Sequence, residues 1–406
     1  MKIRAITGFL NPSWPIQQDI LKSLAASLQA CKRGIEAIGY EVQTLRIATP
    51  PPSRQDHPIP SAQLVAYARA LEAECFVHGI DYAAIGPAFP DELSGYHIIP
   101  SILEATEAVF ASAIIADPGE GVHLEAARAC GQIITDNALI SDDGFGNLRF
   151  AALANVSAGT PFFPASYHSD GPPAIALATE SADVALNTVF QSRTLGEARS
   201  KLIAEIERNA AAVELVLERV CIEGGIRPLG IDFSFAPYPA GGRSFGGALQ
   251  ALGVPAAGVS GSAAAAAFFA SCLDEAQFRR TGFNGLFFPI MEDSVLAARA
   301  AQGLLSITDL LLFSTLCGTG LDTIPLPGDA TAEALTAVLM DVGAIALRHN
   351  KPLTARLMPI PGKGAGDEID FEFEYFAPGR VMALKSQPLS GMLSGTDPLP
   401  ITHRHG

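Results

Sequence analysis

The residues with the clearest chemical potential lie in segment 316–329, which reads LCGTGLDTIPLPGD. It contains a thiol, Cys317, and a carboxylate, Asp322, in an otherwise apolar stretch. Gly318 and Gly320 flank Thr319 beside the thiol, and glycine lets a backbone adopt positive φ or approach a ligand closely. Polar, glycine-rich loops set in apolar sequence are typical of functional sites. The segment is therefore predicted to be a loop that carries catalytic groups.

Cys317 can act as a nucleophile if an open polar loop favours its thiolate. The alternative is an inert buried thiol, which is what we expect of the other five cysteines. These six cysteines are scattered without a CxxC pair, which argues against a disulfide framework or a zinc site and favours a reducing, cytoplasmic location.

The loop GTPFFPASYH, residues 159–168, is the most distinctive in the chain. Phe162 and Phe163 stand between prolines and are costly to expose to water, so we expect them to fill a core or line a pocket. His168 has a side chain suited to proton transfer near neutral pH. It is a candidate proton carrier, and a purely structural histidine is the alternative.

Five carboxylates follow or approach predicted strand ends. Asp232 and Asp322 are the favoured acid/base residues, and together with Glu292 they offer the hard oxygen ligands that Mg²⁺ or Ca²⁺ prefers. Glu292, Asp293 and Asp329 each begin a predicted helix, where a carboxylate caps backbone N–H groups. We therefore place more weight on Asp232 and Asp322.

Four further residues are candidate substrate contacts. Arg243 and Lys363 lie in glycine-rich turns that could hold an anion, although neither turn matches a known nucleotide-binding fingerprint and tight surface turns are the alternative. Asn155 and Ser234 follow predicted strands, and the carboxyl ends of parallel strands are where α/β proteins build their sites.

Composition narrows the classes of partner. The net charge is −15 and no basic run is present, so a nucleic acid is not expected. No run of 18 apolar residues or secretory signal is visible in the sequence, which argues against a membrane partner. A small-molecule ligand is the expected partner. The apolar composition, 49% hydrophobic and 17% charged, favours a sheet buried on both faces and a homo-oligomer.

The order of elements predicts an α/β fold with a mostly parallel sheet. Predicted strands alternate with helices, and no long linker divides the 406 residues, so one domain is expected, with an irregular tail from about residue 386. An additional edge strand is predicted at 371–375. The ten core strands are predicted at 2–10, 40–47, 82–89, 113–116, 149–157, 175–179, 229–235, 285–290, 309–317 and 354–361, and the longer helices at 17–38, 62–78, 102–112, 123–131, 197–219, 260–272, 292–303 and 330–350.

Five motifs in order, ANVSAGTPFFPASYH, IDFSFAPYPAGGRS, GLFFPIMEDS, LCGTGLDTIPLPGD and RLMPIPGKGAGD, resemble the uncharacterised domain-of-unknown-function 711 family (DUF711). The resemblance covers about residues 150–370. It implies an α/β barrel of the pyruvate formate-lyase type, in which ten strands form two parallel halves packed antiparallel around a central loop. It also implies that Cys317 lies near that loop, where glycyl radical enzymes keep their catalytic thiol.

The chain departs from glycyl radical enzymes at their C-terminal RVxG[FWY] segment. The nearest stretch, PGRVMALKSQ, has Arg380 and Val381 but no glycine after them. We therefore predict an enzyme that acts on a small polar or anionic metabolite by acid/base or metal-assisted chemistry, as a hydrolase or lyase. The first alternative is a non-catalytic small-molecule sensor, and the second is a radical enzyme that uses Cys317.

Overall fold

The computed structural model describes residues 1–169, 171–316 and 318–404, so the predicted nucleophile Cys317 lies outside the described residues. Within them the chain alternates strands and helices, as the sequence predicts. The strands are β1 (Lys2–Phe9), β2 (Val42–Ala48), β3 (Tyr82–Ala84), β4 (Val109–Asp117), β5 (Gly121–Val122), β6 (Phe150–Ala154), β7 (Ala174–Glu180), β8 (Arg227–Asp232), β9 (Gly320–Pro327), β10 (Leu353–Ile360), β11 (Glu368–Ile369) and β12 (Gly379–Arg380).

One ten-stranded sheet organises the fold. Its strand order is β8-β7-β1-β2-β3-β4-β6-β10-β9, and β5 pairs with β4. Strands β1, β2, β3, β4 and β6 form a parallel run. The parallel pairs β7–β8 and β9–β10 flank this run and are antiparallel to it. The carboxyl ends of the central run and of the flanking pairs therefore lie at opposite ends of the sheet.

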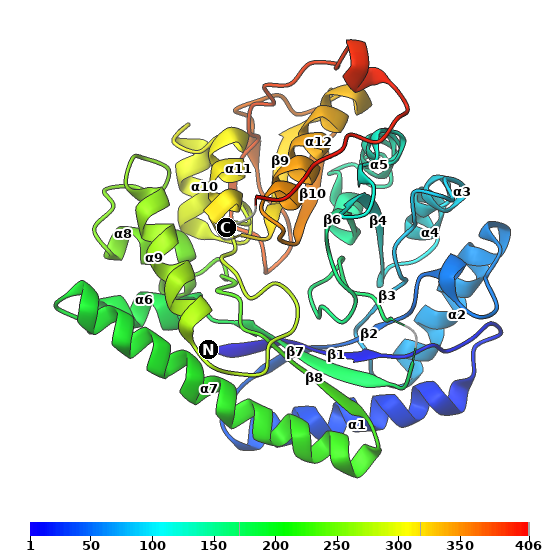
Figure 1. The fold of residues 1–406 in the computed structure, drawn as a ribbon, viewed down its shortest axis with the longest axis horizontal. Coiled ribbons are helices and arrows are strands. Elements are labelled where there is room, and N and C mark those ends of the chain that lie inside the picture. The colour runs from blue at the N-terminus through cyan, green and yellow to red at the C-terminus, as the bar shows by residue number, and fades with distance from the viewer. Residues whose placement is uncertain (170, 317, 405–406) are drawn as a thin grey trace.

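Helices cover the outer side of the sheet, which curves so that β9 and β10 lie across from β1 and β7 (Figure 1). The α-helices are α1 (Gln18–Ala37), α2 (Leu64–Val77), α3 (Ser94–His97), α4 (Ile99–Glu104), α5 (Leu124–Asn137), α6 (Ala182–Phe190), α7 (Leu195–Gly224), α8 (Phe245–Ala251), α9 (Ser262–Glu275), α10 (Ser294–Ala301), α11 (Ile307–Leu316) and α12 (Ala332–Arg348). Helices α1 and α7 pack along β1, β2 and β8, whereas α5 and α12 pack on β4, β6 and β10 (Figure 1). No described helix is long and apolar enough to cross a membrane.

The inner side of the curved sheet is filled partly by the loop between β6 and β7. Phe163 from this loop packs with Phe9 and Phe110, and Ala165 packs with Ile114. Two apolar groups that the sequence places in a loop are therefore buried against the sheet. This explains why a proline-flanked Phe-Phe pair occurs outside any strand or helix.

Much of the described part of segment 316–329 is a strand and not a loop. Residues 307–316 form helix α11, where the sequence suggested a strand or a helix-to-strand edge, and residues 320–327 form strand β9. Pro325 and Pro327 are tolerated because β9 lies at the end of the strand order, and an edge strand has one side without a ladder of hydrogen bonds.

Two other strand predictions and one helix prediction are corrected. Residues 285–290 form no regular strand and contribute only an isolated bridge between Phe235 and Leu286. Residues 371–375 pair with no strand. In the predicted helix 102–112, α4 ends at Glu104 and β4 begins at Val109. The terminal strands β8 and β9 do not pair with each other among the described residues, so the pairing shows a mixed α/β sheet and not a closed barrel.

Candidate functional site

A cavity of about 450 Å³ lies on the inner side of the sheet, a volume within the range of small-molecule sites. Its walls come from strands, from segments that precede β4 and β6, and from the loop after β6. It lies toward the amino ends of the central parallel strands. The charged residues that line it are Arg4, Arg46, Glu104, Glu107, Arg149, Glu292 and Arg356, and the aromatic ones are Tyr82, Phe110, Phe145, Phe162, Phe163, Phe373 and Tyr375.

Arg46 of β2 is the cavity's distinctive cation. Its Nε donates to Thr44 Oγ1 at 2.9 Å, and its guanidinium lies 5.0 Å from the centre of the Phe163 ring and 5.7 Å from that of Tyr82. It forms no ion pair with a carboxylate among the described residues. Burial, and then the nearby charge of Arg4, lower the pKa of Arg46 to about 10, so it carries its charge at neutral pH. A guanidinium group has the planar array of donors that suits a carboxylate or a phosphate.

Two of the other arginines that line the cavity, Arg4 and Arg356, are compensated by carboxylates. Glu292 accepts from Arg4 through one oxygen and from Arg356 through the other, the latter at 2.9 Å. Arg356 also donates from Nε to Asp322 at 2.7 Å. We call Arg4, Glu292, Arg356 and Asp322 the ion chain. Arg4 belongs to β1, Asp322 to β9 and Arg356 to β10, and Glu292 lies just before helix α10. The two positive and two negative charges of the ion chain balance.

The pKa values of Asp322 and Arg356 are both raised, but for different reasons. Burial raises the pKa of Asp322, and Arg356 offsets this only in part. Burial lowers the pKa of Arg356, but the charges of Asp322 and Glu292 outweigh it, so the net pKa is raised. Asp322 Oδ2 is buried and has no hydrogen-bond partner among the described residues. Asp322 does not line the cavity, so Glu292 is the carboxylate of the chain that a ligand can reach.

Arg149 also lines the cavity but has a structural role. Its guanidinium donates to the backbone oxygens of Leu103 at 2.6 Å and of Thr106 at 2.8 Å. These oxygens end helix α4 and precede β4, so Arg149 holds the turn between them. Burial lowers the pKa of Arg149, while Glu72 and Glu107 partly offset that effect.

The predicted pair Asp232 and Ser234 lies beside the ion chain. Both residues line a hollow of about 20 Å³ together with Arg4 and Glu292. Asp232 accepts from the backbone N–H groups of Phe283 at 2.8 Å and Asn284 at 3.0 Å, and from the Ser234 hydroxyl at 2.5 Å. These donors fix the chain around residue 283, so Asp232 anchors this segment, and it lines the small hollow and not the large cavity.

Arg243 does not offer an open cationic site. Its guanidinium donates to the buried carboxylate of Glu180 at 2.8 Å and lies over the ring of Tyr238 at 3.7 Å. Glu180 also accepts from Gln43 at 2.6 Å. The predicted anion contact is therefore already neutralised within the protein.

Three predicted residues lie away from the cavity. Lys363 is exposed in the turn after β10. Asn155 directly follows β6 and lines a separate hollow of about 250 Å³, where its amide donates to Asn350 at 3.3 Å. His168 is buried beside Phe9, and its backbone N–H donates to Thr49, the residue after β2, at 3.1 Å. Asn155 and His168 follow the carboxyl ends of the central strands, which lie at the opposite end of the sheet from the cavity.

The three carboxylates that were predicted to cap helices have different positions in the structure. Asp293 caps α10 by accepting from Val295 and Leu296, and it also accepts from Phe245 and Gly246 at the start of α8. Glu292 belongs to the ion chain instead. Asp329 is exposed, and the N-cap of α12 is Thr331.

The three predicted metal ligands do not fit a divalent cation. Each Glu292 oxygen already accepts from an arginine, and both Asp232 oxygens accept from backbone N–H groups. Asp322 Oδ1 is bonded to Arg356, so the group leaves one unoccupied oxygen beside two guanidinium charges. Among the described residues no cluster of three His, Cys, Asp or Glu side chains could hold a metal.

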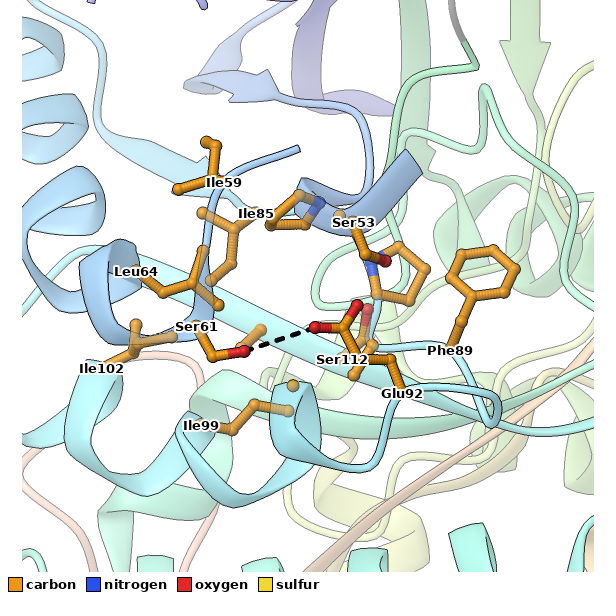
Figure 2. Close-up of a pocket in the computed structure, with 16 residues that line it drawn as sticks. Ser53, Ile59, Ser61, Leu64, Ile85, Phe89, Glu92, Ile99, Ile102 and Ser112 are labelled. Carbon is orange, nitrogen blue, oxygen red and sulfur yellow. Dashed lines mark hydrogen bonds between the residues drawn. The ribbon is translucent and has the colours of Figure 1, made fainter. Parts of the chain in front are cut away.

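A smaller hollow near α2 and α4 has room for water but not for a metabolite. Figure 2 shows its lining, in which the Ser61 hydroxyl donates to the Glu92 carboxylate at 3.4 Å. Its volume is about 30 Å³, and the buried Ser112 hydroxyl that lines it has no partner among the described residues. A single water would satisfy that hydroxyl.

Sequence reasoning missed the arginines that define the cavity. Arg4, Arg46 and Arg356 each interrupt an apolar strand, in KIRAITGF, VQTLRIA and LTARLMPI. A charged residue inside an otherwise buried strand is unusual unless it is paired or faces a cavity, and that was the available signal. The prediction that Phe162 and Phe163 line a pocket is confirmed.

Comparison with known proteins gives a consistent result. The model of the family described as "Uncharacterised ACR (DUF711)" matches residues 1–374. A UPF0210 protein of Pyrobaculum islandicum is 30% identical over 413 residues, covering 95% of this chain and 90% of that protein. A UPF0210 protein of Lactobacillus delbrueckii subsp. bulgaricus is 28% identical over 404 residues, covering 94% and 89%.

Proposed function

Because the chain belongs to the DUF711 family of uncharacterised proteins, we propose that it is an enzyme that binds a small anionic metabolite in the central cavity. Its chemistry is polar and non-radical, of the hydrolase or lyase type. The observation that carries the proposal is Arg46, a half-buried cation beside the cavity with no carboxylate partner among the described residues. A ligand anion would supply the missing partner, and a charge-assisted hydrogen bond is among the stronger polar contacts in proteins.

Glu292 is the candidate base. A carboxylate has about four lone-pair positions, and the hydrogen bonds from Arg4 and Arg356 occupy two of them. The remaining positions can accept a proton or a hydrogen bond from a ligand in the cavity. Tyr375 also lines the cavity, and burial raises the pKa of its hydroxyl, which therefore stays a proton donor at neutral pH.

A non-catalytic sensor is the alternative, and one observation favours it. The cavity contains many groups that could bind a ligand, but both carboxylate oxygens of Glu292 already accept a hydrogen bond from a guanidinium. Binding of an anion without turnover would fit that arrangement. Product formation from a bound ligand distinguishes the two functions.

We propose that the scaffold is the barrel implied by the family resemblance, completed by residues 279–290. In this segment Arg279 accepts from Ile231 at 2.9 Å, and Gly285 accepts from Phe235 at 3.1 Å. At its far end Ile290 donates to Asp322 of β9 at 3.2 Å. These bonds support closure because they join the segment to both terminal strands.

The five described cysteines are unpaired and buried, which supports a reducing, cytoplasmic location.

The test of anion binding is a calorimetric titration of the wild type and Arg46→Gln with a panel of carboxylates and phosphate monoesters. We expect at least one anion to bind, and Arg46→Gln to lower its affinity about 10–100-fold, because a hydrogen bond to a charged group contributes roughly 1.5–3 kcal/mol. Lys363→Gln is the matched control. It removes the same charge at an exposed turn outside the cavity and should change the affinity less than about twofold.

Binding unaffected by Arg46→Gln would refute the proposed site. If an anion binds, its incubation with the wild type and with Glu292→Gln, followed by NMR, tests turnover. Conversion by the wild type that Glu292→Gln abolishes supports the enzyme. Binding without conversion supports the sensor.

A further inference from the structure

The lining of the cavity separates charge from apolar surface, and this limits which anions fit. Within the ion chain the positive charges of Arg4 and Arg356 are balanced by Glu292 and Asp322. The charge of Arg149 is stabilised by backbone oxygens and by Glu107. One uncompensated positive charge remains, on Arg46.

Additional negative charge on a ligand would meet repulsion. Glu104 and Glu107 line the cavity and are exposed, and Glu292 lies on its inner side. A dianion such as a phosphate monoester brings a second charge for which the described residues offer no further unpaired cation. The charge balance therefore favours a monoanion, and a planar guanidinium matches the two oxygens of a carboxylate.

The surface next to Arg46 is aromatic. The Phe163 and Tyr82 rings lie under its guanidinium, and the Phe110 ring lies 5.3 Å from each of them, edge to face. A carboxylate held by Arg46 would place the rest of its molecule against these rings. A fully polar acid would leave that surface without a partner and would lose its own hydration.

A second group of aromatic residues also lines the cavity. Residues 371–376 contribute Phe373 and Tyr375 to the lining, and the Phe373 ring packs edge to face on Phe145 at 5.2 Å. The aromatic rings of both groups favour a flat apolar ligand, because aromatic pairs gain energy beyond their buried area.

We propose that the ligand is a monocarboxylic acid with a planar apolar group, of the arylcarboxylate or arylacetate class. Its carboxylate binds Arg46, and its ring lies between Phe110 and Phe373. This inference rests on the proposed function, since it names the ligand class of the same cavity. It adds that the aromatic walls, and not the arginine alone, select the ligand.

The test is a calorimetric titration of the full chain with benzoate, phenylacetate, acetate and malate. We expect the two aryl acids to bind at least tenfold more tightly than acetate and malate. Phe373→Leu should weaken phenylacetate at least threefold. Phe371→Leu is its matched control, because Phe371 belongs to the same segment but does not line the cavity, and it should leave the affinity within twofold of the wild type.

The outcomes separate the two proposals. Tighter binding of malate or acetate, lost in Arg46→Gln, would overturn the aryl class and keep the anion site. Equal effects of Phe373→Leu and Phe371→Leu would show that the wall does not select the ligand, and would also overturn the aryl class. An absence of binding by every carboxylate and phosphate tested would overturn both proposals.

Discussion

The arginines of this protein have different roles, which depend on the groups that contact each guanidinium. Arg4 and Arg356 share Glu292, and Arg243 is neutralised by Glu180. Arg46 donates to Thr44 and faces aromatic rings, with no carboxylate partner among the described residues. A buried charge is tolerated when it is paired or hydrogen-bonded, so the first three stabilise the fold. The unpaired charge of Arg46 is a cost to the empty protein that a bound anion would remove.

Arg356→Leu should lower the free energy of unfolding by about 3–5 kcal/mol, because it leaves Asp322 and Glu292 buried with one cation fewer. The measurement is urea unfolding at pH 7. Arg380→Leu is the control, since the partner of Arg380 is the exposed Glu368, and its cost should be less than about 1 kcal/mol. Similar losses in the two variants would show that the ion chain is not the stabilising unit we describe.

The pairing of strands in the sheet positions the charged side chains of the ion chain. Strand β9 supplies Asp322, β10 supplies Arg356, and their parallel pairing brings the two side chains together. The segment 371–376 alternates between half-buried aromatic residues and exposed acidic ones, Glu372 and Glu374. This alternation is typical of a strand, but here it orients rings toward the cavity from a segment that pairs with no strand.

Gly320→Ala should disrupt the start of the β9–β10 pair and lower the free energy of unfolding by about 3 kcal/mol. Gly320 has φ +103°, and an added Cβ would lie 2.0 Å from the backbone oxygen of Thr354. Gly241→Ala, where an added Cβ meets nothing within 4 Å, should change stability by less than about 0.5 kcal/mol. Urea unfolding at equilibrium checks both, and an unaltered Gly320→Ala variant would contradict the close approach of the two strands.

The whole molecule is held together by contacts distant in sequence. The N-terminal strand β1 lies in the middle of the strand order, β10 pairs with β6, and Leu399 near the C-terminus pairs with Val122. Parts of the described chain that are distant in sequence are thus joined within one sheet. One domain over residues 1–406 stays a prediction.

Calorimetric unfolding should therefore show a single transition, with a ratio of van't Hoff to calorimetric enthalpy close to about 1. The cause is the shared sheet, whose halves cannot bury their apolar faces separately. The measurement is differential scanning calorimetry of the monomeric chain. Two resolved transitions would mean that the chain contains two independently folding units.

Local pattern was sufficient where a segment's structure depends on its own residues. Helix α1, helix α12 and strands β1 and β10 match the predicted ranges within about two residues, because apolar spacing and cap residues determine them. Local pattern failed at β9, because its prolines and glycines predicted a loop. The edge position of β9 in the sheet allows these residues in a strand.

The sequence by itself determined the α/β class, the family and the residues able to do chemistry. Only the tertiary structure decided which of those residues meet. Carboxyl ends of strands gather at one edge only when all strands run the same way, and here the flanking pairs run opposite to the central five. Asp232, at the carboxyl end of β8, therefore lies at the opposite end of the sheet from Asn155 and His168, which follow the carboxyl ends of central strands. The cation of the site, Arg46, comes from inside a strand.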